Sequence, residues 1–273
     1  MPEIEPQDSA LKSLAGLHLW HAPMSSCSQR VRIALAESGR SYDSHVINLE
    51  KDEHATPEYQ AIHPKGLVPA LVEDGKLFIE SIDIIRQIAD QNSALAQVEN
   101  DELLGMADAA QLDLKLLTFE FLFRAGPPPP QATADAFQKS HNNEWLRQFR
   151  INFANGFDPV KVNEAIAQTD VGFQTLNARL ADGREFLEGP NFTLSDIAWM
   201  PNFHRFQLMD WPFERTPHVQ AWFDRVAARK SYKDALLAWQ PAPVAGTFAE
   251  YTAQRRTEGT DVRSFPHFQA GQL

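Results

Sequence analysis

The chain has 273 residues, of which 43% are hydrophobic and 22% charged, as is typical of a soluble globular protein with one large domain or two modest ones. Its formal net charge of −11 argues against nucleic acid or an anionic membrane surface as the main partner. The single cysteine excludes an intramolecular disulfide and a cysteine-rich metal site. No apolar run approaches the roughly 18 residues of a membrane span, and the first ten residues lack the features of a signal peptide. We therefore expect a protein of the reducing cytoplasm.

The first third of the chain alternates between strand and helix patterns. We expect residues 1–14 to be a polar extension without a fold of its own. The Asp74-Gly75 pair between two apolar runs is a strong hairpin signal. The elements expected in order are a strand at 17–20, a helix to about Ser38, a strand at 44–49, a short helix to Ile62, hairpin strands at 66–73 and 76–79, and a helix carrying Ile82, Ile84, Ile85 and Ile88.

After a polar connector, Asn92 to Asp101, only helical patterns follow. The expected helices are 103–123, about 143–153, 160–180, 194–208 and 218–228. Four prolines at 127–130 cannot lie inside a helix, so they predict an extended loop. Thr193 and Asp196 form a capping-box-like start for an apolar helix, a structural feature. Residues 246–273 are a polar tail that is either disordered or draped over the body.

One polar stretch, Ser25-Ser26-Cys27-Ser28, lies between the first strand and the first helix. Ser25 and Ser26 are both candidate N-caps. The backbone N–H groups and the dipole of a helix N-terminus favour negative charge, and a thiolate needs such an environment. The stretch alone is equally consistent with an ordinary cap followed by a buried cysteine.

Several motifs in residues 17 to about 92 together resemble the glutathione S-transferases, and within them the zeta class (maleylacetoacetate isomerases). They are Ser25-Ser26-Cys27-Ser28 with Arg30-Val31-Arg32-Ile33-Ala34-Leu35, Ile47-Asn48-Leu49, Tyr59-Gln60-Ala61, Val68-Pro69-Ala70-Leu71 and Glu80-Ser81. The second half resembles the family less closely. The length of the chain is also similar to that of proteins in the related tetrachlorohydroquinone dehalogenase and β-etherase branches. The resemblance implies a thioredoxin-like α/β domain (15–92), an all-α helical-bundle domain (93–245), a homodimer, and glutathione as co-substrate without a metal.

The resemblance also implies roles for individual residues. Ser25 would donate a hydrogen bond to the glutathione thiolate, and Cys27 would lie beside the thiol and could form a mixed disulfide, with Ser26 in support. Glu80 would meet the γ-glutamyl ammonium and Ser81 the adjoining carboxylate. Val68, before a cis proline, would pair its backbone with the cysteinyl moiety. Lys65 is the candidate for the glycyl carboxylate, with Lys51 as a rival, and His63 is read as a turn residue.

The second substrate, a small hydrophobic electrophile, would lie between the first loop and the helical domain. The candidates for its pocket are Met24, Phe121, Arg124 and His204, with Arg124 or His204-Arg205 able to hold an acidic substrate. The expected function is a glutathione-dependent transferase. The alternatives are a reductive dehalogenase or ether-cleaving lyase that uses Cys27, a zeta-type cis–trans isomerase, and a non-catalytic binding or scaffold protein.

Overall fold

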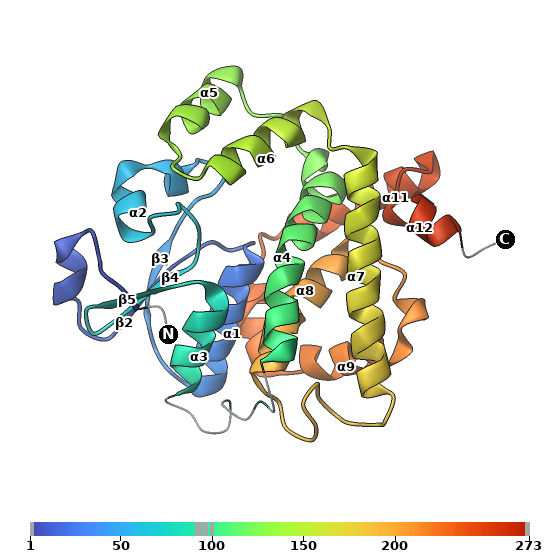
Figure 1. Ribbon diagram of the computed structural model, residues 1–273, viewed down its shortest axis with the longest axis horizontal. Coiled ribbons are helices and arrows are strands. Elements are labelled where there is room, and N and C mark those ends of the chain that lie inside the picture. The colour runs from blue at the N-terminus through green and yellow to red at the C-terminus, as the bar shows by residue number, and fades with distance from the viewer. Residues whose placement is uncertain (1–2, 91–94, 96–97, 99–100, 271–273) are drawn as a thin grey trace.

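In the computed structural model, which describes residues 3–90, 95, 98 and 101–270, five strands form one mixed sheet (Figure 1). The strands are β1 (Glu3–Ile4), β2 (Leu17–His21), β3 (Asp43–Val46), β4 (Ala70–Glu73) and β5 (Lys76–Ile79), in the spatial order β1-β5-β4-β2-β3. β2 and β3 are parallel, whereas the β1–β5, β2–β4 and β4–β5 pairs are antiparallel. The thioredoxin-like order expected from the sequence is therefore present. The strand expected at 44–49 is shorter and begins one residue earlier.

The two faces of the sheet are covered by different segments. On one face, α1 (Ser26–Ser38) and α3 (Ser81–Ala89) pack over Leu19, Leu71 and Phe78. On the other, Tyr59 of α2 (Pro57–Ile62) packs with Trp20, Val72 and Leu77. Neighbouring residues of a strand point to opposite faces. Burial on both sides explains the apolar runs of the inner strands β4 and β5, whereas the edge strand β3 reads Asp-Ser-His-Val and is largely exposed.

The expectation that residues 1–14 have no fold of their own is wrong. β1 pairs antiparallel with β5, with Glu3 opposite Phe78. A 3₁₀ helix, η1 (Ser9–Ser13), buries Leu11, whose side chain is only 3% exposed, in the same cluster as Trp20. The free edge of β5 offers backbone partners to an extended segment, and this is the reason that a polar extension becomes ordered.

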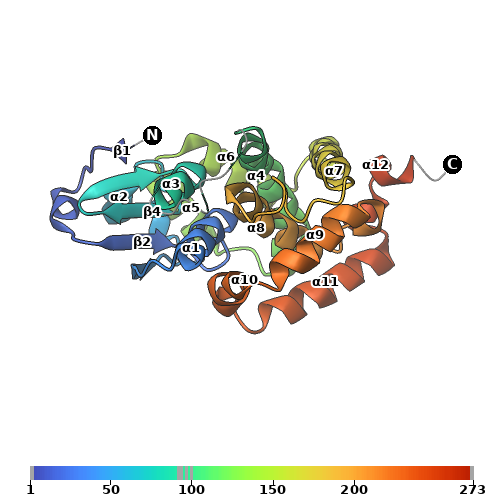
Figure 2. The same cartoon turned by 90° about the horizontal axis from the view of Figure 1, so that it is seen from below.

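The C-terminal part is all helical, as expected (Figures 1 and 2). Its helices are α4 (Glu102–Phe121), α5 (Gln131–Ser140), α6 (Glu144–Asn155), α7 (Pro159–Leu180), α8 (Leu194–Leu208), α9 (Pro217–Ala227), α10 (Lys230–Ala235), α11 (Val244–Glu258) and α12 (Pro266–Gln269). Residues 127–130 form an extended loop before α5, in agreement with the proline pattern. The helices α5, α10, α11 and α12 were not expected from the sequence.

Helix α8 is the centre of this half and packs against α1, α4 and α9. Its residues from Leu194 to Phe206 are buried. Thr193 and Asp196 form the capping box that the sequence indicates. The carboxylate of Asp196 also accepts hydrogen bonds from the N–H of Leu187 (3.0 Å) and from Nε1 of Trp222 (2.7 Å). The helix start is thus fastened both to the loop before it and to α9.

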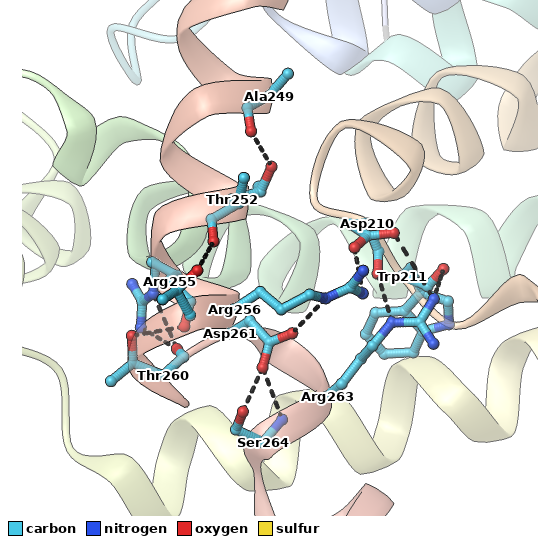
Figure 3. Close-up of polar contacts among 12 residues, drawn as sticks. Asp210, Trp211, Ala249, Thr252, Arg255, Arg256, Thr260, Asp261, Arg263 and Ser264 are labelled. Atoms are coloured by element: carbon cyan, nitrogen blue, oxygen red, sulfur yellow. Dashed lines mark hydrogen bonds and ion pairs between the residues drawn. The ribbon is translucent and has the colours of Figure 1, made fainter.

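The tail is helical and packed against the body, which resolves the alternative left open between disorder and drape. The expected boundary at residue 246 lies inside α11. Arginine side chains hold the segment. Figure 3 shows that Arg255 donates to the carbonyl oxygen of Thr260, that Arg256 pairs with Asp210, and that Arg263 donates to the carbonyl oxygen of Asp210 (3.1 Å). The Arg255 guanidinium also donates to the carbonyl oxygen of Glu120 at 2.7 Å. A polar tail is therefore ordered through its arginines.

The expected boundary between residues 92 and 93 lies outside the described residues; α3 ends at Ala89 and α4 begins at Glu102. Figure 2 shows the sheet with α1–α3 at one end of the molecule and α7, α11 and α12 at the other. Within the described ranges, no helix combines the length and apolar character needed to cross a membrane.

Candidate active site

Three segments adjoin the sheet at the same end of its strands, which we call the sheet edge of the site. Trp20, near the end of β2, pairs with Ala70 at the start of β4, and Ala70 pairs with Ile79 at the end of β5. The segments that adjoin these strands are the start of α1 at Ser25–Cys27, the Val68-Pro69 bond and the Glu80-Ser81 pair. Strand register therefore brings together residues that are up to 56 positions apart in the chain.

Ser25 is the N-cap of α1. Its Oγ accepts a hydrogen bond from the N–H of Ser28 at 3.2 Å, a geometry that satisfies one of the free donors of the helix start. A hydroxyl both accepts and donates, so its own proton stays available. In the part of the chain that the structure describes, nothing accepts that proton. The cap role and the predicted donor role are thus compatible.

Ser26 and Cys27 both contact Gln111 of α4, a residue that the sequence analysis missed. Ser26 Oγ donates to Gln111 Oε1 at 2.6 Å, and Cys27 Sγ lies 3.4 Å from the same oxygen. Gln111 Nε2 in turn donates to Asn202 Oδ1 of α8 at 2.5 Å. Cys27 is half-buried. The thiol thus lies at the junction of the two halves of the molecule and is held by a polar network.

The Val68-Pro69 bond is cis, as the resemblance implies. Val68 is half-buried, and within the described ranges neither its N–H nor its C=O has a hydrogen-bond partner. The preceding turn is held by Gly66, at φ +57°, whose carbonyl oxygen contacts His141 Nε2 at 3.1 Å. His63, in the same turn, is buried, and burial lowers the pKa of its imidazole to about 4. Its Nδ1 accepts from the N–H of Lys65 (3.3 Å), consistent with the turn role.

Glu80 and Ser81 begin α3. Glu80 has a positive φ of 69° and its carboxylate pairs with Lys65 Nζ at 2.6 Å. Both side chains are about half exposed, at 46% for Glu80 and 57% for Lys65. Lys65 and Glu80 are therefore partners of each other in this structure, although the sequence analysis gave them separate roles.

Ser81 is buried and accepts a hydrogen bond from Arg30. Arg30 Nη1 donates to Ser81 Oγ at 3.2 Å, Nη2 to the carbonyl oxygen of Ala107 at 2.6 Å and Nε to that of Ala198 at 2.9 Å. The guanidinium is wholly buried, and burial lowers its pKa. Arg30 thus links the start of α3 to α4 and α8. Among the residues that the structure describes, nothing accepts the proton of Ser81 Oγ, so this hydroxyl can donate to a ligand.

Two residues assigned to the electrophile pocket lie in the core, so that assignment is wrong for both of them. Phe121 is 2% exposed and packs edge-on against Phe265, with the Arg255 guanidinium over its ring. His204 is 5% exposed, and its two ring nitrogens contact Tyr232 OH (2.7 Å) and Gln240 Oε1 (3.2 Å). Burial lowers the pKa of His204 to about 4. Sequence periodicity could not distinguish these core positions from a pocket wall.

The other two pocket candidates remain near the surface. Met24 is half-buried beside the main core, and its carbonyl oxygen accepts from Arg205. Arg124 pairs with Glu120 at 2.7 Å, and its guanidinium lies 4.7 Å from the ring centroid of Phe153. Glu120 also binds Arg255, so Arg124 belongs to a network that fastens the tail.

Lys115, one helical turn after Gln111, was likewise not expected from the sequence. Its Nζ lies 5.0 Å from the ring centroid of Trp145 and 5.3 Å from that of Phe149. No short-range pattern singles it out, because Asp108, Asp113, Thr118 and Glu120 are also polar residues of α4. Within the described residues, no group of three or more His, Cys, Asp or Glu side chains could hold a metal.

Two family models match the chain. The glutathione S-transferase N-terminal domain matches residues 24–91, and the glutathione S-transferase C-terminal domain matches residues 143–225. Together they span more than half of the chain and include the segments at the sheet edge.

Individual relatives agree with these matches. The chain is 25% identical to a tetrachloro-p-hydroquinone reductive dehalogenase from Sphingobium chlorophenolicum. The similarity extends over 239 residues, or 80% of this chain and 94% of that protein. It is 44% identical over 82 residues to a maleylacetoacetate isomerase from Pseudomonas aeruginosa, or 29% of this chain and 39% of that protein. The crystal structure of a β-etherase from Sphingobium sp. strain SYK-6 has the same fold, with a TM-score of 0.71 at 20% identity, over 81% of this chain and 99% of that one. The chain belongs to the glutathione S-transferase superfamily.

Proposed function

We propose that this protein is a glutathione-dependent transferase that activates the thiol of glutathione for attack on a hydrophobic electrophile. The observation that carries the proposal is the strand register that gathers Ser25, the cis Val68-Pro69 bond and Glu80-Ser81 at one sheet edge. The glutathione S-transferase N-terminal domain model, which matches residues 24–91, covers all of these residues.

The three segments match the three parts of the tripeptide. The free N–H and C=O of Val68 can pair with the cysteinyl moiety in the manner of an added strand. The carboxylate of Glu80 can bind the γ-glutamyl ammonium, while the hydroxyl and N–H of Ser81 bind the neighbouring carboxylate at the start of α3. An exposed ion pair such as Lys65–Glu80 is worth about 0–1 kcal/mol. The ligand ammonium can therefore replace Lys65 at little cost, and Lys65 can then approach the glycyl carboxylate.

The chemistry follows from the position of the thiol sulfur at the start of α1. The Ser25 hydroxyl donates to the thiolate, and the helix N-terminus adds a favourable dipole. Both effects stabilise the thiolate relative to the thiol and so lower the thiol pKa. Holding the electrophile next to the sulfur supplies the rest by proximity. Met24 and Arg124 stay as candidates for the walls of this second site.

Calorimetric titration with glutathione, together with turnover of a generic aryl halide, tests the proposal. The intact protein should bind glutathione, and Ser25→Ala should bind it but lose most turnover. Ser38→Ala, at the other end of α1, is the matched control and should keep both. Absence of glutathione binding by the intact protein would refute the enzyme proposal and leave the binding or scaffold alternative.

A reductive reaction is the second candidate, favoured by the half-buried Cys27 beside Gln111 and by the similarity to the reductive dehalogenase. Glutathione would first displace halide from the ring and form an aryl thioether. The Cys27 thiolate would then attack the glutathione sulfur, and the released aryl carbon would take up a proton. This leaves a Cys27–glutathione disulfide. A second glutathione attacks its glutathione sulfur, which releases oxidised glutathione and restores the Cys27 thiol. Cys27→Ala should therefore stop at the thioether, whereas a conjugating enzyme would be indifferent to this change.

The finer assignments remain our proposals. The identity to a maleylacetoacetate isomerase supports a zeta-like N-terminal half, and activity on a maleyl substrate would favour isomerisation.

We also propose a cytoplasmic homodimer with a detoxifying role, on the family resemblance and the single cysteine. Light scattering of the purified protein measures its assembly. The division into a glutathione-binding part and a helical part with the electrophile pocket likewise stays a proposal.

A further inference from the structure

One face of α4 points from the thiol region toward α6. Gln111 on this face contacts Ser26 and Cys27, and Lys115 follows it by four residues. Side chains at i and i+4 of a helix are neighbours, with roughly 5–6 Å between their Cβ atoms. A group that contacts Lys115 is therefore next to the position at which the glutathione sulfur would lie.

The Lys115 ammonium is flanked by aromatic rings. Throughout the described ranges no carboxylate pairs with it, and its Nζ lies instead over the rings of Trp145 and Phe149. The charged neighbour from α6, Arg150, is paired with Asp52. The electrostatic neighbours Cys27, His54, His141 and Arg150 face Lys115 from α1, η2 (Glu53–Ala55), the α5–α6 turn and α6. Burial lowers the pKa of Lys115 to about 8, so the cation is costly until an anion joins it.

Aromatic rings flank this ammonium. Trp145 is 47% exposed and stacks on Phe149, with 5.3 Å between ring centroids and 25° between planes. Phe119 of α4 packs edge-on against Phe149 at 4.9 Å. An exposed indole on a rigid support of rings is a platform on which a planar ligand can stack, and such pairs contribute about 0.5–1.5 kcal/mol beyond burial. The ammonium and the indole therefore select for the same kind of ligand, an aromatic anion.

We propose that Lys115 and Trp145 form the subsite of the second substrate and select an aromatic electrophile that carries an anionic group, a carboxylate or a phenolate. Lys115 binds the anion and Trp145 the ring, which places the reacting carbon toward the start of α1. The inference rests on the proposed function and names the substrate class. It also replaces Phe121 and His204, which lie in the core, with two residues that keep exposed surface.

Binding tests the subsite without any need for turnover. The probes are 3,5-dinitrobenzoate and its methyl ester, which share the ring but not the charge, titrated by calorimetry against the full chain with and without glutathione. The intact protein should bind the benzoate at least tenfold more tightly than the ester. In Lys115→Met the ratio of the two affinities should fall to about one, whereas Lys115→Arg should keep most of the preference. Trp145→Ala should weaken the binding of both probes. Lys161→Met on α7 is the control and should keep the preference.

Three outcomes would overturn the inference: equal affinity of the intact protein for the two probes, no binding of either, or an unchanged preference in Lys115→Met. Weaker binding of glutathione but not of the benzoate in Lys115→Met would also overturn it, because Lys115 would then hold the glycyl carboxylate. Failure of the proposed function is a separate result, the absence of glutathione binding, which the same instrument measures. Thermal melting of each variant shows that it is folded.

Discussion

Replacing Asp196 with alanine should destabilise the protein more than almost any other single polar substitution. The carboxylate is wholly buried at the start of α8 and accepts from three N–H groups, those of Leu187 (3.0 Å), Thr193 (2.8 Å) and the Trp222 indole (2.7 Å). Alanine leaves all three donors without a partner, and the site is too buried for water to replace the carboxylate freely.

The magnitude follows from the number of orphaned donors. A buried donor left without a partner costs about 1–3 kcal/mol, so three of them amount to roughly 3–6 kcal/mol after partial relaxation. Most domains have a total stability of about 5–15 kcal/mol. Asp196→Asn keeps one acceptor oxygen but turns an amide donor toward the N–H groups, so we expect a smaller loss of about 1–3 kcal/mol.

Urea unfolding at pH 7.5, followed by tryptophan fluorescence, measures these losses. At this pH the carboxyl is ionised, since burial raises its pKa only to about 6 against the opposing hydrogen bonds. Asp182→Asn, an exposed carboxylate bound to Arg184, is the control and should leave the midpoint unchanged. A midpoint for Asp196→Ala within error of the intact protein would show that this carboxylate does not fasten the start of α8. If Asp196→Ala does not fold, Asp196→Asn carries the test.

Three further predictions concern other parts of the molecule. Gly66→Ala should cost about 1–3 kcal/mol because φ is +57° and a Cβ would lie 2.7 Å from His141 Nε2, whereas Gly105→Ala in α4 meets open space and should not destabilise. Arg30→Lys keeps the charge but loses the guanidinium group that donates to Ser81, Ala107 and Ala198. Both the melting temperature and the glutathione affinity should therefore fall. An unchanged affinity would show that Ser81 is not needed for ligand binding. Burial lowers the pKa of four histidines to about 3 or 4, while their unfolded value is 6.5, so the stability that they contribute should be full above pH 6.5 and fall on acidification toward pH 4. The loss should be about 1.4 kcal/mol per pH unit for each histidine. A midpoint independent of pH in this window would contradict the burial of His21, His54, His63 and His204.

The sequence by itself determined the features that depend on neighbouring residues. Short spacings set the Asp74-Gly75 hairpin, the capping box of Thr193 and Asp196 and the bounds of α8, and they narrowed the cap of α1 to Ser25 or Ser26. A motif such as Val68-Pro69 also carried its cis bond through family resemblance. Apolar periodicity placed the long helices well but not the ends of the short strands, since the strand expected at 66–73 begins only at Ala70.

The tertiary structure decided what these elements contact. Residues 3–4 pair with the edge of β5, and the C-terminal segment binds Glu120 and Asp210. No local sequence pattern predicts these contacts. The same holds at the site, where Gln111 contacts Ser26 across 85 positions of the chain. An aromatic or a histidine at helical spacing faces the core or a pocket according to which helices pack beside it. The positions of Phe121, His204, Lys115 and Trp145 therefore follow only from long-range packing. Contacts between residues that are distant in the chain contribute to the free energy of folding but leave no local sequence pattern.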